Sequence, residues 1–346
     1  MGTVCQIGLD IAKNVFQAHG IDQHGKTIFS KKLARGSVLR FFANLTPCLI
    51  GIEACGGAHY WAREISKLDT GHTVKLIPPK LVKPFVINNK TDAADARAIC
   101  EVVGRHEIHF VPIKTIDQQD ILAWHRIRSR NVKERTALVN QIRGLMLEHG
   151  IIVPQGITKI RNQLPFIIED LNNELSASSR DYLSDLYAEL CQYDERIKKY
   201  EIRIQQFAKT NEICKKLEKI PGIGFLTATA IVGHFGKAEN FKNGRSMAAC
   251  LGLTPREHSS GGKQRLLGIS KRGDIYIRCL LIQGARNVVR CGLQKVNEQS
   301  TGQIKWLSDI VIRRGHHKAS VALANKMARV AWHIMSSGDE YRATAA

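Results

Sequence analysis

VCQIGLDIAKNVFQAHG (residues 4–20) holds two short apolar runs with a polar break between them, and an aspartate follows the first run. Val4 to Leu9 predicts a buried strand, and Asn14 to Gly20 predicts a second one. A third strand is predicted over Lys26 to Leu33, after a turn at Asp22–Gly25. The chain therefore begins with three strands in succession.

Helices and strands alternate through the rest of the first hundred residues. Helical spacing covers Val38 to Leu45, and the Ala-rich stretch TDAADARAICEVV predicts a helix over residues 91–103. Buried strands are predicted at Leu49–Ile52 and at Thr73–Ile77, with a helix between them. The order is strand, strand, strand, helix, strand, helix, strand, helix, which indicates an α/β layer fold.

The middle of the chain is predicted to be long helices, interrupted near Pro154 and Gly156. In the second helical run, apolar residues recur at alternating spacings of three and four, namely Leu183, Leu186, Leu190, Tyr193, Ile197, Tyr200, Ile204 and Phe207. This heptad seam is typical of a coiled coil, and equally of an amphipathic helix packed on its own domain. We predict three parts: an α/β domain over 1–113, a helical coiled-coil region over 114–210, and a mainly α-helical domain over 211–346.

The charge balance points to a polyanionic partner. The chain has 51 Lys and Arg against 31 Asp and Glu, a formal net charge of +20, and residues 241–346 alone hold 18 against 6. Because the basic residues are spread along the chain, we favour nucleic acid over an anionic membrane surface. No run approaches the roughly 20 apolar residues that span a bilayer. The first ten residues lack the features of a signal peptide, so we expect a cytoplasmic protein whose nine cysteines are reduced.

Four carboxylates stand out by position. Asp10 and Glu53 end two predicted strands, and Asp92 and Asp95 lie three residues apart on one helix. Alone, each is more typical of a turn, a cap or a solvated face. Together they form a set that would repel itself unless divalent cations were bound, and hard oxygen ligands suit Mg²⁺ or Mn²⁺. With this strand order, the set predicts a ribonuclease-H-like site for phosphoryl transfer.

IGLDIAKNVF (residues 7–16) also resembles the first phosphate loop of actin-like ATPases and sugar kinases. That interpretation requires a second Asp-Gly phosphate loop, and the sequence contains neither such a loop nor a Walker A motif. It is therefore the weaker alternative.

The basic C-terminal part contains two motifs. Pro221-Gly222-Ile223-Gly224 lies between two helical runs. It predicts either a helix-hairpin-helix, whose turn at Gly222 and Gly224 approaches a phosphate, or a plain helix-helix turn. Further on, Ser259 and Ser260 precede two glycines. A serine there is a candidate nucleophile on a phosphodiester, although such a stretch is more often a simple loop. Candidate phosphate contacts nearby are Arg256, Lys263, Arg265, Lys271, Arg272 and Arg278.

These segments together resemble the DEDD transposases of bacterial insertion sequences, a family that includes Piv-type DNA invertases and bridge-RNA-guided recombinases. The resemblance covers nearly the whole chain. It rests on IGLDIAKNVFQAHG, GIEACGGAHYWARE, KTDAADARAICE, and IPGIG followed by LGLTPREHSSGGKQRLLGISKRGD, in that order.

The resemblance implies a RuvC-like N-terminal domain whose acidic tetrad is Asp10, Glu53, Asp92 and Asp95, binding a divalent metal. It implies a serine nucleophile at Ser260, directly before Gly261, with Ser259 one alignment step away. It also implies a homo-oligomer, dimer or tetramer, in which the tetrad of one protomer faces the serine of another. The partners would be double-stranded donor and target DNA and a structured bridge RNA, and the protein would associate with the nucleoid.

We therefore predict a transposase that cuts and rejoins DNA through the metal-bound tetrad and a covalent link to Ser260. Two alternatives stay open. One is a RuvC-like nuclease or strand-transferase that uses water or a 3′-hydroxyl, and the other is a non-catalytic RNA-binding scaffold.

Overall fold

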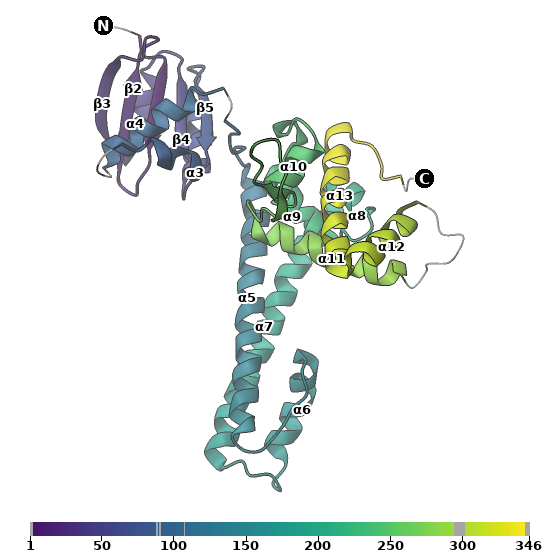
Figure 1. The fold of residues 1–346 in the computed structure, drawn as a ribbon. Helices are drawn as coiled ribbons and strands as arrows, with labels where there is room; N and C mark the ends of the chain where they lie inside the picture. Colours follow the sequence, from purple (N-terminus) through teal and green to yellow (C-terminus); the bar gives the residue numbers. More distant parts are fainter. Residues whose placement is uncertain (1–2, 88, 90, 107, 294–301, 343–346) are drawn as a thin grey trace. The chain divides into compact units, whose positions relative to one another are not determined.

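A computed structural model describes residues 3–87, 89, 91–106, 108–293 and 302–342. The chain divides into two compact units, Met1–Thr115 and Ile116–Ala346. The first combines a sheet with helices and the second is mostly helical, which confirms the predicted change of fold class along the chain (Figure 1).

The first unit is built on a five-stranded sheet with strand order β3-β2-β1-β4-β5. Its strands are β1 (Gln6–Asp10), β2 (Val15–Ile21), β3 (Thr27–Ala34), β4 (Leu49–Glu53) and β5 (Thr73–Ile77). β1, β2 and β3 pair antiparallel, whereas β4 pairs parallel with both β1 and β5. The strands predicted from the sequence are thus all present, each within a residue or two of its predicted bounds.

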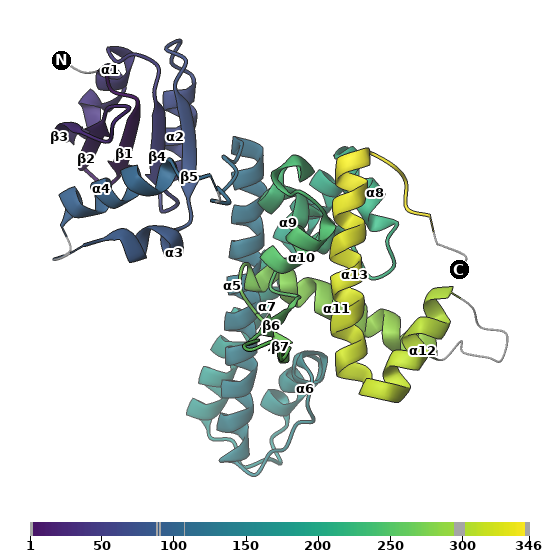
Figure 2. The same cartoon turned by 45° about the horizontal axis from the view of Figure 1, so that its top comes forward.

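Helices cover both faces of this sheet (Figure 2). They are α1 (Val38–Ala43), α2 (Ala58–Ser66), the short α3 (Pro79–Val82) and α4 (Asp92–Val103). One core joins the sheet to α1 and α2 and includes Ile7, Leu9, Ile50, Ile52 and Trp61. A second core joins it to α3 and α4 and includes Ile77, Val82, Ile99, Val102 and Val103. Since strand side chains alternate between faces, Gly8 and Gly51 lie on the α4 side.

The close approach of α4 depends on these two glycines. A Cβ atom added at Gly8 would lie 2.1 Å from the Ala96 carbonyl oxygen and 2.3 Å from the Cys100 nitrogen. A Cβ atom added at Gly51 would lie 2.7 Å from the Val103 Cβ. Any larger residue would therefore push the helix away from the sheet.

The second unit begins with two long helices that lie side by side in both views, α5 (Ile116–Leu147) and α7 (Ala177–Thr210) (Figures 1 and 2). α6 (Ile157–Glu169), which was not predicted from the sequence, packs on α7. The alternating positions Leu183, Leu190, Ile197 and Ile204 are buried. Leu183 and Leu190 share a core with residues of α5 and α6, so the heptad seam packs within its own chain.

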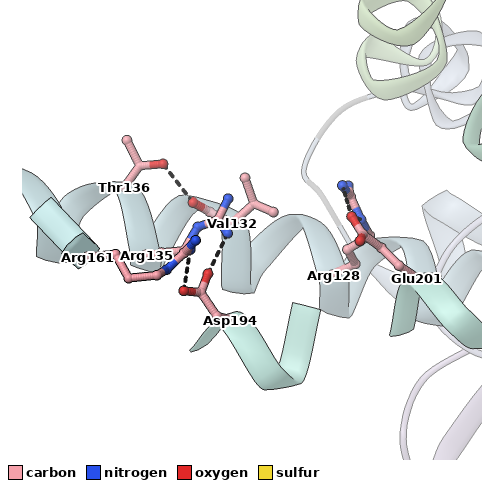
Figure 3. Close-up of polar contacts among 7 residues, drawn as sticks. All are labelled: Arg128, Val132, Arg135, Thr136, Arg161, Asp194 and Glu201. Atoms are coloured by element: carbon pink, nitrogen blue, oxygen red, sulfur yellow. Dashed lines mark hydrogen bonds and ion pairs between the residues drawn. The ribbon is translucent and has the colours of Figure 1, made fainter. Parts of the chain in front are cut away.

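Charged side chains fix the pairing of these helices (Figure 3). Arg128 on α5 donates to Glu201 on α7 at 2.6 Å, and Arg135 donates to Asp194 at 2.7 Å. Arg161 on α6 bonds the other oxygen of Asp194. Pairs this exposed each contribute no more than about 1 kcal/mol, so their main effect is on register and orientation.

The rest of the second unit is a helical core with one β-hairpin. Its elements are α8 (Glu212–Glu218), α9 (Phe225–Phe235), α10 (Gly244–Cys250), β6 (Pro255–Glu257), β7 (Leu266–Ile269), α11 (Ile275–Leu293), α12 (Gly302–Arg314) and α13 (His316–Ser337). A buried polar group connects this core to α5, because the His125 ring bonds both the Tyr276 and the Thr229 hydroxyls at 2.9 Å. The β6–β7 hairpin lies where the sequence predicted only a loop.

Candidate functional site

Two of the predicted carboxylates lie at adjacent strand ends. Asp10 is the last residue of β1 and Glu53 the last of β4, and the pairing of these parallel strands ends at Leu9 and Ile52. The next residue on each strand is the carboxylate, so both project from the same edge of the sheet. Both are half-buried.

The same two residues face α4. The Gln6 side chain donates to the Cys100 carbonyl, and Gly8 lies against Ala96 and Cys100. Asp10 lies two residues beyond Gly8 on the strand, a distance of roughly 6.6 Å, and Asp92 lies four residues before Ala96 on the helix, a rise of roughly 6 Å. The next position on this face, Asp10, is therefore level with the first turn of α4.

That first turn carries the other two carboxylates. Thr91 caps the helix, its side chain accepting a hydrogen bond from the Ala94 N–H at 3.2 Å. Asp92 and Asp95 follow in the first turn, Asp92 exposed and Asp95 half-buried. The positive end of the helix dipole favours negative charge here. The fold thus brings the backbone positions of all four predicted carboxylates to one edge of the sheet.

The Cys55 thiol, close in sequence to Glu53, is affected by the negative charge at this edge. Partial desolvation of the Cys55 side chain raises its pKa, and the charges of Glu53 and Asp10 raise it further. Asp10 and Glu53 therefore both act on the same neighbouring thiol.

The oxygen donors at this edge fit a hard divalent cation by type. In the parts of the chain that the structure describes, however, no three His, Cys, Asp or Glu side chains form a ready-made metal-binding group.

The predicted serines lie on the β6–β7 hairpin. Gly261 and Gly262 have φ of 56° and 74°, and the Lys263 N–H donates to the Ser260 carbonyl at 3.1 Å. This is a two-residue turn of the kind that closes tight hairpins and that glycine adopts most readily. It places Ser260 at the exposed tip.

The two serines differ in their hydrogen bonds. The Ser259 hydroxyl donates to a Glu257 carboxylate oxygen at 2.6 Å and accepts from the Arg265 N–H at 3.3 Å. The hydrogen bonds from Ser259 and Gln264 lower the pKa of Glu257. Among the residues that the structure describes, none forms a hydrogen bond with the Ser260 hydroxyl. Ser259 therefore stabilises the loop, and the hydroxyl of Ser260 is open to a ligand.

Arg278 corrects one prediction. It was expected to contact phosphate, but it is 6% exposed and donates to the Leu251 carbonyl at 3.0 Å and the Arg272 carbonyl at 2.8 Å. Its guanidinium instead holds together the two chain segments from which the hairpin rises. The other five predicted phosphate contacts, Arg256, Lys263, Arg265, Lys271 and Arg272, are exposed on or beside the hairpin.

The Pro221–Gly224 turn has one packed and one open glycine. Gly222 has a φ of 91°, and a Cβ atom added to it would lie 3.0 Å from the Gly284 carbonyl oxygen of α11. Gly222 therefore allows the turn to pack closely against α11 and does not face a ligand. Gly224 is exposed before the first turn of α9, with open space where a Cβ atom would stand.

Comparison with known proteins supplies the identity. A family model described as "Transposase IS116/IS110/IS902 family" matches residues 214–301, and the transposase model DEDD_Tnp_IS110 matches residues 7–151. A "Probable family 20 transposase" of Pseudomonas aeruginosa is 45% identical over 97% of this chain and 98% of its own. The chain belongs to the IS110 family of transposases.

Further relatives support this assignment. The transposase for insertion sequence element IS1111A of Coxiella burnetii is 42% identical over 97% of this chain and 91% of its own. The transposase for IS1328 of Yersinia enterocolitica is 39% identical over 98% of each chain. The predicted family is confirmed: this chain is an insertion-sequence transposase, an enzyme that acts on DNA.

The family matches cover both candidate regions. The DEDD model spans Asp10, Glu53, Asp92 and Asp95, and its family implies a divalent metal cation. The second model spans Ser260 and its hairpin.

No helix in the described ranges is long and apolar enough to cross a membrane.

Two features that position the site were not predicted from the sequence. Gly8 and Gly51 stand two residues before Asp10 and Glu53, and this Gly-x-acid spacing on two predicted strands was a readable signal for a helix crossing above. The role of Arg278 had no such signal, because its carbonyl partners lie 27 and 6 residues away in an irregular segment.

Proposed function

We propose that this transposase cuts DNA by attack of the Ser260 hydroxyl on a phosphodiester, assisted by a ribonuclease-H-like tetrad of Asp10, Glu53, Asp92 and Asp95. The observation that carries the proposal is the open hydroxyl of Ser260 at the tip of a basic hairpin whose base is clamped by Arg278. The sheet order and the convergence of the strand ends with α4 support the assignment of the tetrad.

In the proposed step, a bond forms between the Ser260 oxygen and phosphorus, and the bond from phosphorus to one strand breaks. The serine proton is lost and the released strand end gains one, which leaves a phosphoserine link. Attack by another strand end reverses the step, so rejoining requires no outside energy source. The exposed cations beside the serine, Arg256, Lys263 and Arg265, would stabilise the phosphate oxygens.

The tetrad would hold Mg²⁺ or Mn²⁺, which when bound would polarise the phosphate and neutralise developing charge. The carboxylates of the tetrad supply the negative field that selects a divalent cation. We further propose that the protein works as a dimer or tetramer in which one protomer's tetrad serves another's serine. A structured bridge RNA that pairs with donor and target DNA suits the net charge of +20. We place its action in the cytoplasm, on nucleoid DNA.

The test is a denaturing gel of the protein with end-labelled donor DNA, the RNA transcribed beside its gene, and Mg²⁺. We expect a protease-sensitive protein–DNA adduct that is lost in Ser260→Ala and in Asp10→Ala. Ser259→Ala is the matched control and should retain the adduct. Cleavage without an adduct, persisting in Ser260→Ala, would establish the water or 3′-hydroxyl mechanism instead. RNA binding with no cleavage would favour the scaffold.

A further inference from the structure

A pocket of about 450 Å³ opens in the first unit beside the carboxylate edge. It is lined by Ile11, Ala12, Lys13, Arg35, Gly56, Gly57, Tyr60 and Trp61. Ile11 directly follows Asp10, and the Gly56-Gly57 loop comes three residues after Glu53. The pocket is therefore built from the same strand ends that hold two of the tetrad carboxylates.

Two aromatic rings form part of the pocket wall. Trp61 is 5% exposed and meets the Phe16 ring edge to face, with centroids 4.9 Å apart, so it is fixed in the core. Tyr60 is 44% exposed, and its ring centroid lies 5.2 Å from that of Trp61. A large aromatic side chain with an open surface beside a rigid one offers a platform for a flat ligand.

Two cations, Lys13 and Arg35, also line the pocket. The Arg35 guanidinium lies 5.1 Å from the centre of the Trp61 ring and donates to the Lys13 carbonyl at 3.2 Å, which holds it in place. Lys13 is exposed. Gly56 and Gly57, which also line the pocket, have no side chains, and no atom lies within 4 Å of a Cβ atom built on Gly56.

We propose that this pocket binds one unpaired nucleotide of the DNA strand next to the phosphate that is cut, with its base against Tyr60 and its phosphate on Lys13 and Arg35. A volume of about 450 Å³ is that of a small-molecule site and excludes a duplex. Aromatic faces and cations in alternation are the usual means of holding single strands. A larger hollow of about 1510 Å³ in the second unit has both acidic and basic side chains in its lining, but it contains no part of the carboxylate edge.

This inference rests on DNA being the substrate, and its test is kept separate from the serine chemistry. Full-length Ser260→Ala protein in EDTA, which can neither cleave nor form a phosphoserine, is mixed with an eight-nucleotide single strand carrying one 5-iodouracil. Irradiation followed by peptide mass spectrometry locates the adduct. We expect it on Tyr60 or Trp61.

Variants then measure what each group contributes. Tyr60→Ala should weaken binding of a short oligo-dT about tenfold, within the range of base-stacking effects, and Tyr60→Phe should restore it. Lys13→Ala should weaken it several-fold. Lys32→Ala, which removes an exposed charge from β3 outside the pocket, is the matched control and should match the parent. With an abasic oligomer, Tyr60→Ala should have no effect.

Two results would overturn the proposal: an adduct confined to residues 116–346, or equal affinities for Tyr60→Ala, Lys13→Ala and Lys32→Ala. Competition by duplex as strong as that by single strand would also exclude an unpaired nucleotide. None of these results depends on whether Ser260 is the nucleophile.

Discussion

Gly8→Ala should displace α4 and the carboxylates it carries. The added Cβ atom would lie 2.1 Å from the Ala96 carbonyl oxygen, and real Cβ contacts essentially never fall below 3.0 Å, so the helix must move by at least about 0.9 Å at that point. Because the obstructing atoms belong to the backbone, no side-chain rotation relieves the contact. Overpacking of this kind costs roughly 1–3 kcal/mol.

The displacement should also reduce activity. A shift of about 1 Å in a catalytic group can cost on the order of a hundredfold in rate. Asp92 and Asp95 lie within about one turn before Ala96 on the same helix, so they move with it. We therefore expect loss of most DNA cleavage from a protein that still folds.

Hydrogen exchange measured by mass spectrometry on peptides covering α4 gives the local readout. A loss of roughly 1–3 kcal/mol corresponds to roughly 5- to 150-fold faster exchange through local opening. Gly36→Ala is the control, since no atom lies within 4 Å of a Cβ atom built there. If α4 exchanges at the same rate in Gly8→Ala and Gly36→Ala, our account of the helix packing is wrong.

Three further changes test other parts of the structure. Arg278→Met leaves the Leu251 and Arg272 carbonyls without their donor. We expect faster hydrogen exchange over residues 255–269 and at least tenfold less protein–DNA adduct. Unchanged exchange would contradict the inference that Arg278 holds the base of the hairpin together. Burial lowers the pKa of His125 from 6.5 to about 4, so the unfolded chain binds the proton more tightly than the folded chain. The free energy of unfolding should therefore fall by about 3 kcal/mol as the pH drops from 6.5 to 4, and His125 should cause no change above that window. Urea titrations across this range should show that slope, and it should be absent in His125→Gln. Leu190→Ala should cost roughly 2–5 kcal/mol in the same titrations, while the exposed control Leu171→Ala should cost almost nothing.

The sequence by itself determined the order of elements in the first unit and the family. Alternating strand and helix patterns are local, so Val4–Leu9, Leu49–Ile52 and Thr73–Ile77 were predicted within a residue or two of β1, β4 and β5. The family followed from several motifs that occur in a set order along the chain. Asp10 and Glu53 were singled out because an acid at the end of a buried strand is conspicuous, and Asp92 and Asp95 because of their spacing on one predicted helix. The roles of all four stay predictions.

What the heptad seam of α7 contacts was decided only by the tertiary structure. A periodic apolar stripe fixes which face of a helix is buried, but not whose surface covers it. The cover proved to be α5 and α6 of the same chain, and α6 itself was not predicted. The β6–β7 hairpin escaped prediction because its strands are only three and four residues long, too short to show a period.

The roles of individual side chains at the site also required the fold. Arg256 and Arg278 look alike in a basic sequence, yet the first is exposed and the second is buried on two carbonyls. The Ser259 hydroxyl bonds both Glu257 and the Arg265 N–H, whereas the Ser260 hydroxyl bonds no residue that the structure describes. Sequence supplies the chemical types, whereas burial and hydrogen-bond partners come from residues far along the chain. Only the folded backbone therefore decides which groups are free to act.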